Sequence, residues 1–325
     1  MTAIKLGIIG AGIMGTRMLR AAIEHATDSV HITGIWDPSA DALARLAAEL
    51  PGIPRLPSPE ALIAVSDCLY IASPPASHLS LAGQALAANK AAFCEKPLAS
   101  DVAAAHAFVT RYTTGHANAR AAVNFPMATS FAAERIRAWL AEAAIGTPTA
   151  LEIDAAFANW PRGWQMAAAP WLDARPEGGF TREVISHFLF LSHRLFGPLA
   201  VLEATAEFPD PTRSERRIAA TLTAGAIPVK LTGAVGTTQK DDHNTWTLTG
   251  TTGAIRLRDW AFAERRINGQ WHPDAAAMPQ DTARPLVLKR QLAGVAALTR
   301  GEPHPLATLA EAFAVQRAVE AILSP

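Results

Sequence analysis

Hydrophobic positions along the first 124 residues follow two alternating patterns. Short runs of consecutive apolar, often β-branched residues are typical of buried strands, and they recur at 4–9, 30–36, 68–72, 91–94 and 120–124. Between them, apolar residues at helical spacing predict helices at 16–24, 39–50, 60–64, 77–89 and 101–113. Strands that alternate with helices in this way predict βαβ units and therefore a doubly wound parallel sheet of the Rossmann type.

The pattern changes after this region. Six β-rich runs follow with few helices between them, at 149–157, 201–208, 217–223, 228–236, 245–249 and 254–257. Turn signals such as Thr252-Gly253 separate some of these runs and favour antiparallel pairing. An apolar helix is predicted at 182–195 and an Ala-rich helix at 306–323. We therefore predict an α/β Rossmann domain over 1–122, and over 123–325 an α+β domain with a large, mainly antiparallel sheet.

Composition narrows the classes of protein that this chain can represent. Half of its 325 residues are hydrophobic and 18% are charged, which excludes a disordered tail. Lys+Arg and Asp+Glu balance at 29 each, so no basic excess indicates nucleic acid or a membrane surface as a partner. Two cysteines cannot form a disulfide framework, and no apolar run reaches the length of a membrane span. We expect a cytoplasmic protein without a signal peptide.

A glycine-rich loop joins the first predicted strand to the first helix. Gly10, Gly12 and Gly15 have the spacing of a dinucleotide-binding loop, in which the second glycine lets a pyrophosphate approach the backbone. The amide groups of Ile13 and Met14 lie at the start of the helix, where free N–H groups and the helix dipole favour phosphate. The alternative interpretation is a generic tight turn. The flanking strand and helix favour the dinucleotide site.

Asp37 ends the second predicted strand, 22 residues after Gly15. A carboxylate at this place can accept hydrogen bonds from both ribose hydroxyls of a dinucleotide, and it repels a 2′-phosphate. This favours NAD over NADP as the cofactor. The alternative is that Asp37 only caps the next helix, although Ser39 could do so equally well.

A charged pair, Glu95-Lys96, follows the fourth predicted strand and precedes Pro97. The carboxyl edge of a parallel sheet is where ligands bind in this class of fold. A lysine at that edge can exchange a proton with a substrate oxygen. The alternative is an ordinary ion pair on the surface.

Together these motifs resemble the Gfo/Idh/MocA oxidoreductases, the family of glucose–fructose oxidoreductase and inositol dehydrogenase. The resemblance also covers Ser73-Pro74-Pro75-x-x-His78 and the later segment from Gly178-Gly179 to His187. It implies that Lys96 is the catalytic acid or base, that Pro97 follows a cis bond and that Glu95 lies beside the nicotinamide ribose. The further cofactor contacts expected from it are Ser73, Pro74, His78, Lys96 and Asn124. Phe125-Pro126 stands where the family has basic residues, so a basic substrate contact is lost there.

The predicted helix 182–195 carries polar residues on a largely apolar surface. Glu183 and His187 are four residues apart, so on an α-helix they can form a hydrogen bond that fixes the imidazole tautomer. The resemblance implies that His187 contacts a substrate hydroxyl or transfers a second proton, and that Glu183 replaces the usual aspartate. The alternative is a purely structural pair. Arg182 could bind an anionic substrate group or face solvent.

Three tryptophans, Trp160, Trp164 and Trp171, precede this helix, and Trp164 and Trp171 could close over a sugar-like or cyclic substrate. A packed loop anchored by these rings is the alternative. Glu183, His187 and His193 do not have the spacing of a metal site, and we predict no metal.

The resulting prediction is an NAD-dependent oxidoreductase that transfers a hydride between the nicotinamide and a secondary alcohol or ketone carbon of a sugar, polyol or cyclic compound. Three alternatives remain: a glycoside hydrolase that keeps its NAD and oxidises the sugar transiently, an imine reductase, and a non-catalytic NAD-binding sensor. The resemblance also implies a homodimer or homotetramer formed through the C-terminal sheet.

Overall fold

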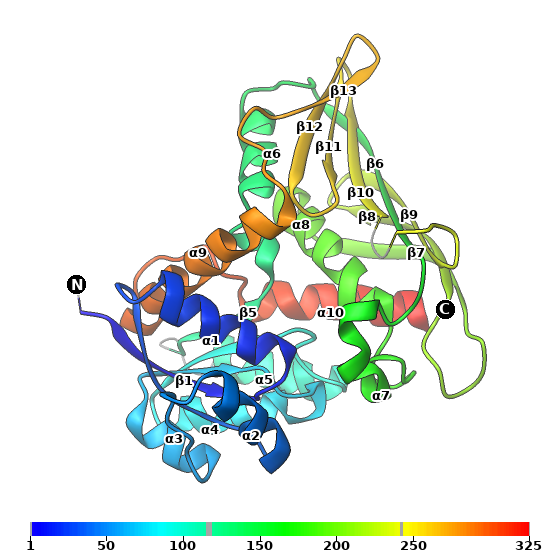
Figure 1. Ribbon diagram of the computed structural model, residues 1–325. Helices are drawn as coiled ribbons and strands as arrows, with labels where there is room; N and C mark the ends of the chain where they lie inside the picture. The colour runs from blue at the N-terminus through cyan, green and yellow to red at the C-terminus, as the bar shows by residue number, and fades with distance from the viewer. Residues whose placement is uncertain (1, 115–118, 241–242, 325) are drawn as a thin grey trace. The chain divides into compact units, whose positions relative to one another are not determined.

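A computed structural model describes residues 2–114, 119–240 and 243–324, and the contacts between residues divide the chain into two compact units (Figure 1). Unit 1 contains the chain up to Pro126 together with Pro285–Phe313. Unit 2 contains Met127–Arg284 and the chain from Ala314 onward. These units differ from the predicted domains at residues 285–313, which belong to unit 1, and the predicted division into 1–122 and 123–325 stays a prediction.

Unit 1 is built on a five-stranded parallel sheet with the strand order β2-β1-β3-β4-β5. This confirms the Rossmann-type prediction. The order of the strands switches direction at β1 and β3, and the ends of β1, β3 and β4 lie side by side at the carboxyl edge of the sheet. The strands are β1 (Ile4–Ile9), β2 (Val30–Trp36), β3 (Cys68–Ile71), β4 (Ala91–Glu95) and β5 (Ala121–Asn124).

Helices join the strands of unit 1 and begin at residues suited to cap them. Ser39 accepts a hydrogen bond from the Ala42 amide (3.2 Å) at the start of α2, and Ser58 accepts one from the Ala61 amide (3.2 Å) at the start of α3. The helices are α1 (Ile13–His25), α2 (Ala40–Glu49), α3 (Pro59–Val65), α4 (His78–Ala87) and α5 (Val102–Thr114).

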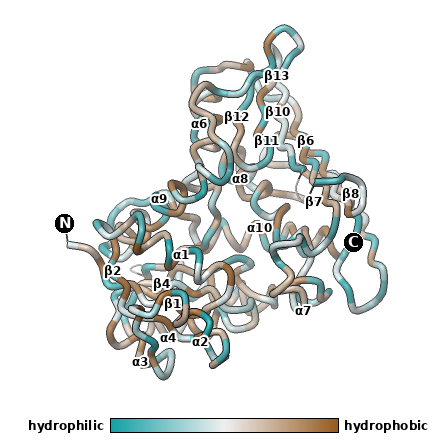
Figure 2. The backbone as a smooth tube through the Cα atoms, viewed as in Figure 1, coloured by the Kyte–Doolittle hydropathy of each residue, from teal (hydrophilic) through white to brown (hydrophobic). Residues whose placement is uncertain are grey.

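Residues 285–313 return to unit 1 because they complete its hydrophobic core. Leu288, Leu292 and Val295 lie on one face of α9 (Gln280–Arg300) and pack in the same buried cluster as Leu6 and Ile8 of β1. The strand β1 is drawn mostly in the brown of hydrophobic residues in Figure 2. The three α9 residues follow each other at intervals of four and three, the spacing of one apolar face of a helix.

Unit 2 is built on an eight-stranded sheet with the order β13-β12-β11-β10-β6-β9-β8-β7. Only β6 and β9 pair in parallel; the other neighbours are antiparallel, which confirms the predicted, mainly antiparallel sheet. The strands are β6 (Pro148–Phe157), β7 (Leu199–Glu207), β8 (Arg217–Ala224), β9 (Ile227–Val235), β10 (His243–Gly250), β11 (Ala254–Arg258), β12 (Phe262–Ile267) and β13 (Gln270–Pro273).

One face of this sheet is covered by α8 (Ser186–Phe196). Trp246 of β10 is fully buried, and its indole N–H donates to the Ser192 hydroxyl (2.9 Å), which fixes the helix on the sheet. The other helices of unit 2 are α6 (Phe131–Ala141) and the short α7 (Ala169–Leu172), and α10 (Leu309–Leu323) crosses from unit 1 into unit 2.

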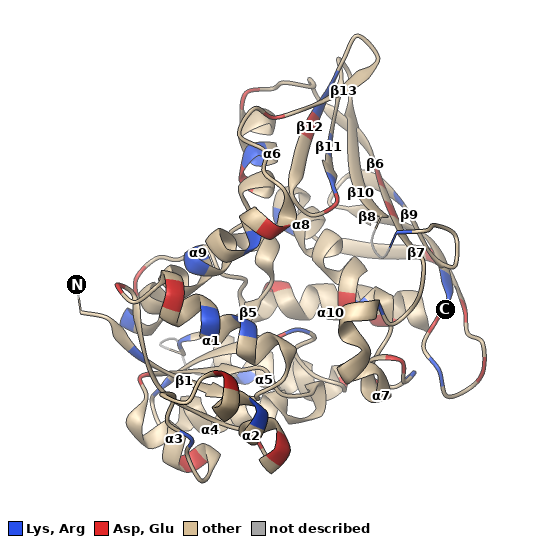
Figure 3. Ribbon diagram, in the orientation of Figure 1, with Lys and Arg blue, Asp and Glu red and all other residues tan. Residues whose placement is uncertain are grey.

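Figure 3 shows Lys and Arg as well as Asp and Glu on helices and strands of both units. For example, α1 and α2 each carry Arg together with Glu, and Arg20 pairs with Glu49 between them (2.5 Å). Among the described residues, no helix is both long and apolar enough to cross a bilayer.

Candidate active site

The glycine loop between β1 and α1 has the geometry of a phosphate-binding turn. Gly10 has φ +106°, a left-handed conformation that favours glycine, and its amide donates to the Trp36 carbonyl (2.8 Å). A Cβ atom on Gly15 would lie 1.8 Å from the Gly10 carbonyl oxygen, so helix and loop pack too closely for any side chain. A Cβ atom on Gly12 would meet nothing within 4 Å. Gly12 therefore faces open space, where a ligand can approach the backbone.

Asp37 is hydrogen-bonded to this loop. Its Oδ2 accepts a hydrogen bond from the Ala11 amide (2.7 Å) and its Oδ1 accepts one from the Ser39 amide (2.8 Å). The N-cap of α2 is Ser39, so the alternative role of Asp37 as a helix cap is wrong. The carboxylate instead joins the glycine loop to the end of β2. Its contact with a cofactor ribose stays a prediction.

Glu95, the last residue of β4, belongs to a chain of buried polar side chains. The Tyr70 hydroxyl of β3 and the Asn124 Nδ2 of β5 (2.7 Å) both donate to Glu95 Oε1, and the Gln291 Nε2 of α9 donates to Asn124 Oδ1. The sequence singles out Glu95 and Asn124 but neither Tyr70 nor Gln291. Lys96 follows, partly exposed, at the carboxyl edge of the sheet, and the Lys96–Pro97 bond is cis.

His78 holds two loops at the same edge of the sheet. Its Nδ1 lies 2.8 Å from the Pro97 carbonyl oxygen and its Nε2 lies 2.7 Å from the Ser73 carbonyl oxygen. The ring is 1% exposed, and burial lowers the pKa of the imidazole. A neutral imidazole has one N–H and donates to one of these two carbonyls, and the expected contact of His78 with a cofactor stays a prediction. Ser73 and Pro74, by contrast, keep exposed surface.

Unit 2 places a buried carboxyl group at the start of the segment that carries Glu183 and His187. Glu215 is fully buried, and its Oε1 accepts a hydrogen bond from the Thr181 amide (2.7 Å). Gly179, with φ +106°, leaves room for this carboxyl group, because a Cβ atom there would lie 2.2 Å from Glu215 Oε2. Burial raises the pKa of Glu215. No motif in the sequence singles out this residue.

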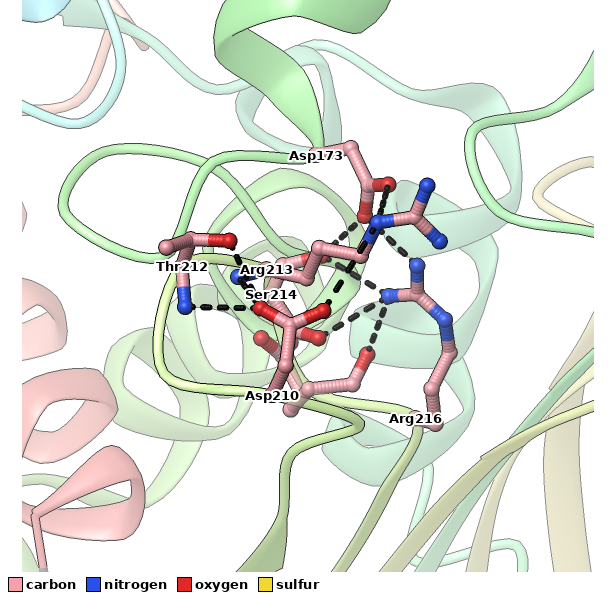
Figure 4. Close-up of polar contacts among 7 residues, drawn as sticks. Asp173, Asp210, Thr212, Arg213, Ser214 and Arg216 are labelled. Atoms are coloured by element: carbon pink, nitrogen blue, oxygen red, sulfur yellow. Dashed lines mark hydrogen bonds and ion pairs between the residues drawn. The ribbon is translucent and has the colours of Figure 1, made fainter.

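The chain segment that carries Glu215 is anchored by an ionic cluster (Figure 4). Asp173 Oδ1 accepts hydrogen bonds from the Ser214 hydroxyl (2.8 Å) and from Arg216 Nη2 (2.7 Å), and the Ser214 amide donates to the Asp173 carbonyl (2.8 Å). Asp210 accepts from the amide and hydroxyl of Thr212 on the same turn. Residues on both sides of Glu215 are therefore held in place.

The helix that follows does not start as an α-helix. Residues 181–185 form a π-helical turn, in which the Ser186 amide bonds to the Thr181 carbonyl, five residues earlier. The predicted hydrogen bond between Glu183 and His187 relies on the four-residue spacing of an α-helix. The π-helical turn changes that spacing at Glu183. Glu183 Oε1 accepts from Gln165 Nε2 (3.2 Å) and lies 3.9 Å from Arg162 Nη2.

His187 is 7% exposed and packs edge-on against Trp260, with the ring centroids 5.3 Å apart. Trp260 has φ +69° in the turn between β11 and β12, a conformation that is uncommon for a bulky residue. The sequence does not single out Trp260, because the strand β12 that follows it is not predicted from the sequence pattern.

Arg182 is bound within unit 2. Its Nε and Nη2 donate to the two carboxylate oxygens of Glu320 (2.7 Å each), and its Nη1 donates to the carbonyls of Arg175 (2.9 Å) and Gly178 (2.7 Å). Neither of its predicted alternatives, an anionic substrate or solvent, describes this bidentate ion pair, and an anion would have to displace Glu320.

The two candidate aromatic residues before this helix differ in exposure. Trp164 is 41% exposed and lies under the Arg162 guanidinium (4.7 Å from the ring centroid), and Trp171 is partly exposed. Both retain surface for a ligand, and their contact with a substrate stays a prediction.

Comparison with known sequences matches residues 4–123 to the model of an oxidoreductase family with an NAD-binding Rossmann fold. An inositol 2-dehydrogenase of Cereibacter sphaeroides is 37% identical over 107 residues, which are 33% of this chain and 32% of that protein. A UDP-N-acetylglucosamine 3-dehydrogenase of Acidithiobacillus ferrooxidans is 30% identical over 109 residues, 34% of this chain and 33% of that protein. The matched part spans about a third of the length of these curated relatives.

Solved structures are similar over nearly the whole chain. An oxidoreductase from Agrobacterium radiobacter, crystallised with NAD⁺, L-tartaric acid and magnesium, has a TM-score of 0.80 at 20% identity and covers 98% of this chain and 95% of its own. The UDP-N-acetylglucosamine 3-dehydrogenase of Acidithiobacillus ferrooxidans has a TM-score of 0.75 at 18% identity, with coverages of 99% and 97%. At these identities the likeness concerns the fold of both units.

Proposed function

We propose that the protein is an NAD-dependent oxidoreductase of the Gfo/Idh/MocA family, because residues 4–123 match the model of an oxidoreductase family with an NAD-binding Rossmann fold. The proposed reaction is hydride transfer between the nicotinamide and a secondary alcohol or ketone carbon of a sugar, polyol or cyclic substrate. One observation carries the proposal: the open face of Gly12 and the exposed part of Lys96 belong to the same carboxyl edge of one parallel sheet.

The residues of unit 1 fit a dinucleotide. Gly12 leaves space at the backbone, the amides of Ile13 and Met14 start α1 without a capping side chain, and Asp37 stands beside the loop. Amides at a helix start bind phosphate oxygens, and a carboxylate can bind ribose hydroxyls. Asp37 would repel a 2′-phosphate, and this repulsion supports NAD rather than NADP. Bound NAD would supply the hydride acceptor or donor.

Lys96 is proposed as the group that exchanges a proton with the substrate oxygen. Glu95, directly before it, accepts buried hydrogen bonds from Tyr70 and Asn124, and the carbonyl oxygen of Pro97, directly after it, lies 2.8 Å from His78 Nδ1. A fixed proton-transfer group contributes about 10²–10⁴ to the rate of such a reaction. In unit 2, His187 stays the candidate for a second proton transfer, with Glu183 beside Gln165 as a candidate substrate contact.

The substrate class is inferred from the relatives. Those named inositol 2-dehydrogenase and UDP-N-acetylglucosamine 3-dehydrogenase have substrates with secondary alcohols on a six-membered ring. The aromatic surfaces of Trp164 and Trp171 are suited to pack against such a ring. Ring polyols and sugars are therefore the first compounds to test.

The decisive experiment is a screen of polyols, sugars and cyclic alcohols with NAD, measured by NADH absorbance, on the wild-type protein, K96M and K90M. We expect K96M to bind NADH normally and to lose turnover by about 10²–10⁴. Lys90 precedes β4 and serves as the matched control, which should retain full turnover. Unchanged turnover in K96M would remove Lys96 from its proposed role. Cleavage of a glycoside without accumulating NADH would favour the hydrolase alternative.

Cofactor choice is tested separately by fluorescence titration with NADH and NADPH. We expect the wild-type protein to bind NADH at least about tenfold more tightly, which corresponds to about 1.4 kcal/mol. D37N keeps the size of the side chain but removes its charge. It should reduce the ratio of the NADPH dissociation constant to the NADH dissociation constant. Equal or tighter binding of NADPH by the wild-type protein would contradict the role of Asp37.

A further inference from the structure

Four buried polar side chains form a continuous hydrogen-bonded chain inside unit 1. It runs from Gln291 through Asn124 and Glu95 to Tyr70, across α9, β5, β4 and β3. Tyr70 and Gln291 are fully buried, Asn124 is 1% exposed and Glu95 is 7% exposed. Burying so many polar groups is costly unless they are bonded to one another, so their arrangement needs an explanation.

The hydrogen bonds determine how the Glu95 carboxyl group is turned. Tyr70 and Asn124 both donate to the same oxygen, Oε1, from the two strands that flank β4. A carboxylate held by two donors on one oxygen has lost its freedom to rotate, and its other oxygen points in a fixed direction. Charge-assisted hydrogen bonds of this kind are roughly twice as strong as neutral ones.

Gln291 acts one step further away. Its Nε2 donates to Asn124 Oδ1, which leaves the Asn124 amide with its Nδ2 toward Glu95. A flipped Asn124 would present an oxygen to the carboxylate and would repel it. Gln291 therefore selects the amide orientation that suits Glu95.

Tyr70 is suited to remain a donor. Burial, followed by the charge of Glu95, raises the pKa of the phenol well above its ordinary value. The hydroxyl keeps its proton and continues to donate to the carboxylate.

We propose that Tyr70 and Gln291 are positioning residues that hold the Glu95 carboxylate, directly and through Asn124, in the orientation that binds a ribose hydroxyl of the nicotinamide half of the cofactor. This rests on the proposed function. Neither Tyr70 nor Gln291 touches the cofactor in this role; each acts through Glu95.

The experiment is a double-mutant cycle in which NADH affinity is measured by NADH fluorescence. The variants are Y70F, Q291M, E95A, Y70F/E95A and Q291M/E95A. We expect Y70F and Q291M to raise the NADH dissociation constant about fivefold or more, because one hydrogen bond of the chain is lost. In the E95A background neither change should weaken binding further. The control is Y112F, which removes the hydroxyl of the second of the two tyrosines in the protein and should leave NADH affinity unchanged.

The outcomes separate the two levels of inference. A wild-type protein that binds no NADH would contradict the proposed function itself. Wild-type binding with no change in Y70F and Q291M would overturn only the positioning role. The same conclusion would follow if either change weakened binding equally with and without Glu95. Thermal melting of each variant identifies a loss that comes from unfolding alone.

Discussion

The substitution G12A separates the contribution of the glycine loop to the stability of the fold from its contribution to cofactor binding. Gly12 has φ −79° and ψ −166°, a conformation that alanine adopts freely, and the added methyl group would meet no atom within 4 Å. At such positions alanine stabilises a protein by about 0.4–1 kcal/mol through the unfolded state. Glycine is preferred to alanine as an N-cap by about 1 kcal/mol, which offsets this gain. We expect the melting temperature to change by no more than about 4 °C.

The same methyl group occupies the space where a pyrophosphate would approach the loop. We expect G12A to bind NADH at least about tenfold more weakly, a loss of about 1.4 kcal/mol or more. G52A is the matched control, because a methyl group there also meets nothing within 4 Å but lies far along the chain from the loop. It should bind NADH as the wild-type protein does. The assays are NADH fluorescence titration and thermal melting.

G15A provides the opposite contrast, since its methyl group would lie 1.8 Å from the Gly10 carbonyl oxygen. It should lower the melting temperature as well as the affinity. Equal NADH affinity in G12A, G52A and the wild-type protein, with G12A folded, would refute the assignment of this loop to the cofactor.

Three further predictions concern stability. Burial raises the pKa of Glu215 above its ordinary 4.5, so ionisation of this carboxyl group destabilises the folded state. The free energy of unfolding of E215Q relative to that of the wild-type protein should therefore increase as pH rises above about 4.5. Chemical denaturation at several pH values measures this difference, and a difference that stays constant with pH would contradict the prediction. L292A should lower the free energy of unfolding by about 2–5 kcal/mol, measured by urea denaturation, because Leu292 is fully buried in the core of unit 1; a loss below about 1 kcal/mol would contradict its packing role. R182M should cost about 3 kcal/mol in the same assay, because it leaves Glu320 without its bidentate partner, and a neutral result would show that the ion pair is dispensable.

The parallel sheet of unit 1 could be predicted because its strands are short, mainly apolar runs. The charged or polar residues Lys5 and His31 inside them are exposed and do not obscure the pattern. Strand β12 could not be predicted, since buried Glu264 and the arginines beside it look like a solvated segment. Glu264 is accommodated only because Arg256 and Arg258 of the neighbouring strand pair with it. Helix α9 was missed because it begins with polar residues and Pro285, and its apolar face finds its partners in β1, far away in the sequence.

The same distinction holds for the site. Gly12, Asp37 and Lys96 carry signals that are local in the sequence, namely a spacing, a strand end and a charged pair. Tyr70 and Gln291 carry none, because a tyrosine in a strand and a glutamine in a helix gain meaning only when the fold brings them together. Glu215 belongs to the same group: its role becomes visible through the amide of Thr181, 34 residues earlier.

The return of residues 285–313 to unit 1 has a consequence for the biosynthesis of the protein. The ribosome releases the five strands of the nucleotide-binding sheet early, but Leu288, Leu292 and Val295, which complete its core, emerge only after the whole central segment of unit 2 has been made. Domains are usually completed in the order of synthesis. Here part of the apolar surface of the first sheet stays uncovered until the last quarter of the chain has been synthesised. A fragment ending near residue 126 should expose that surface and aggregate.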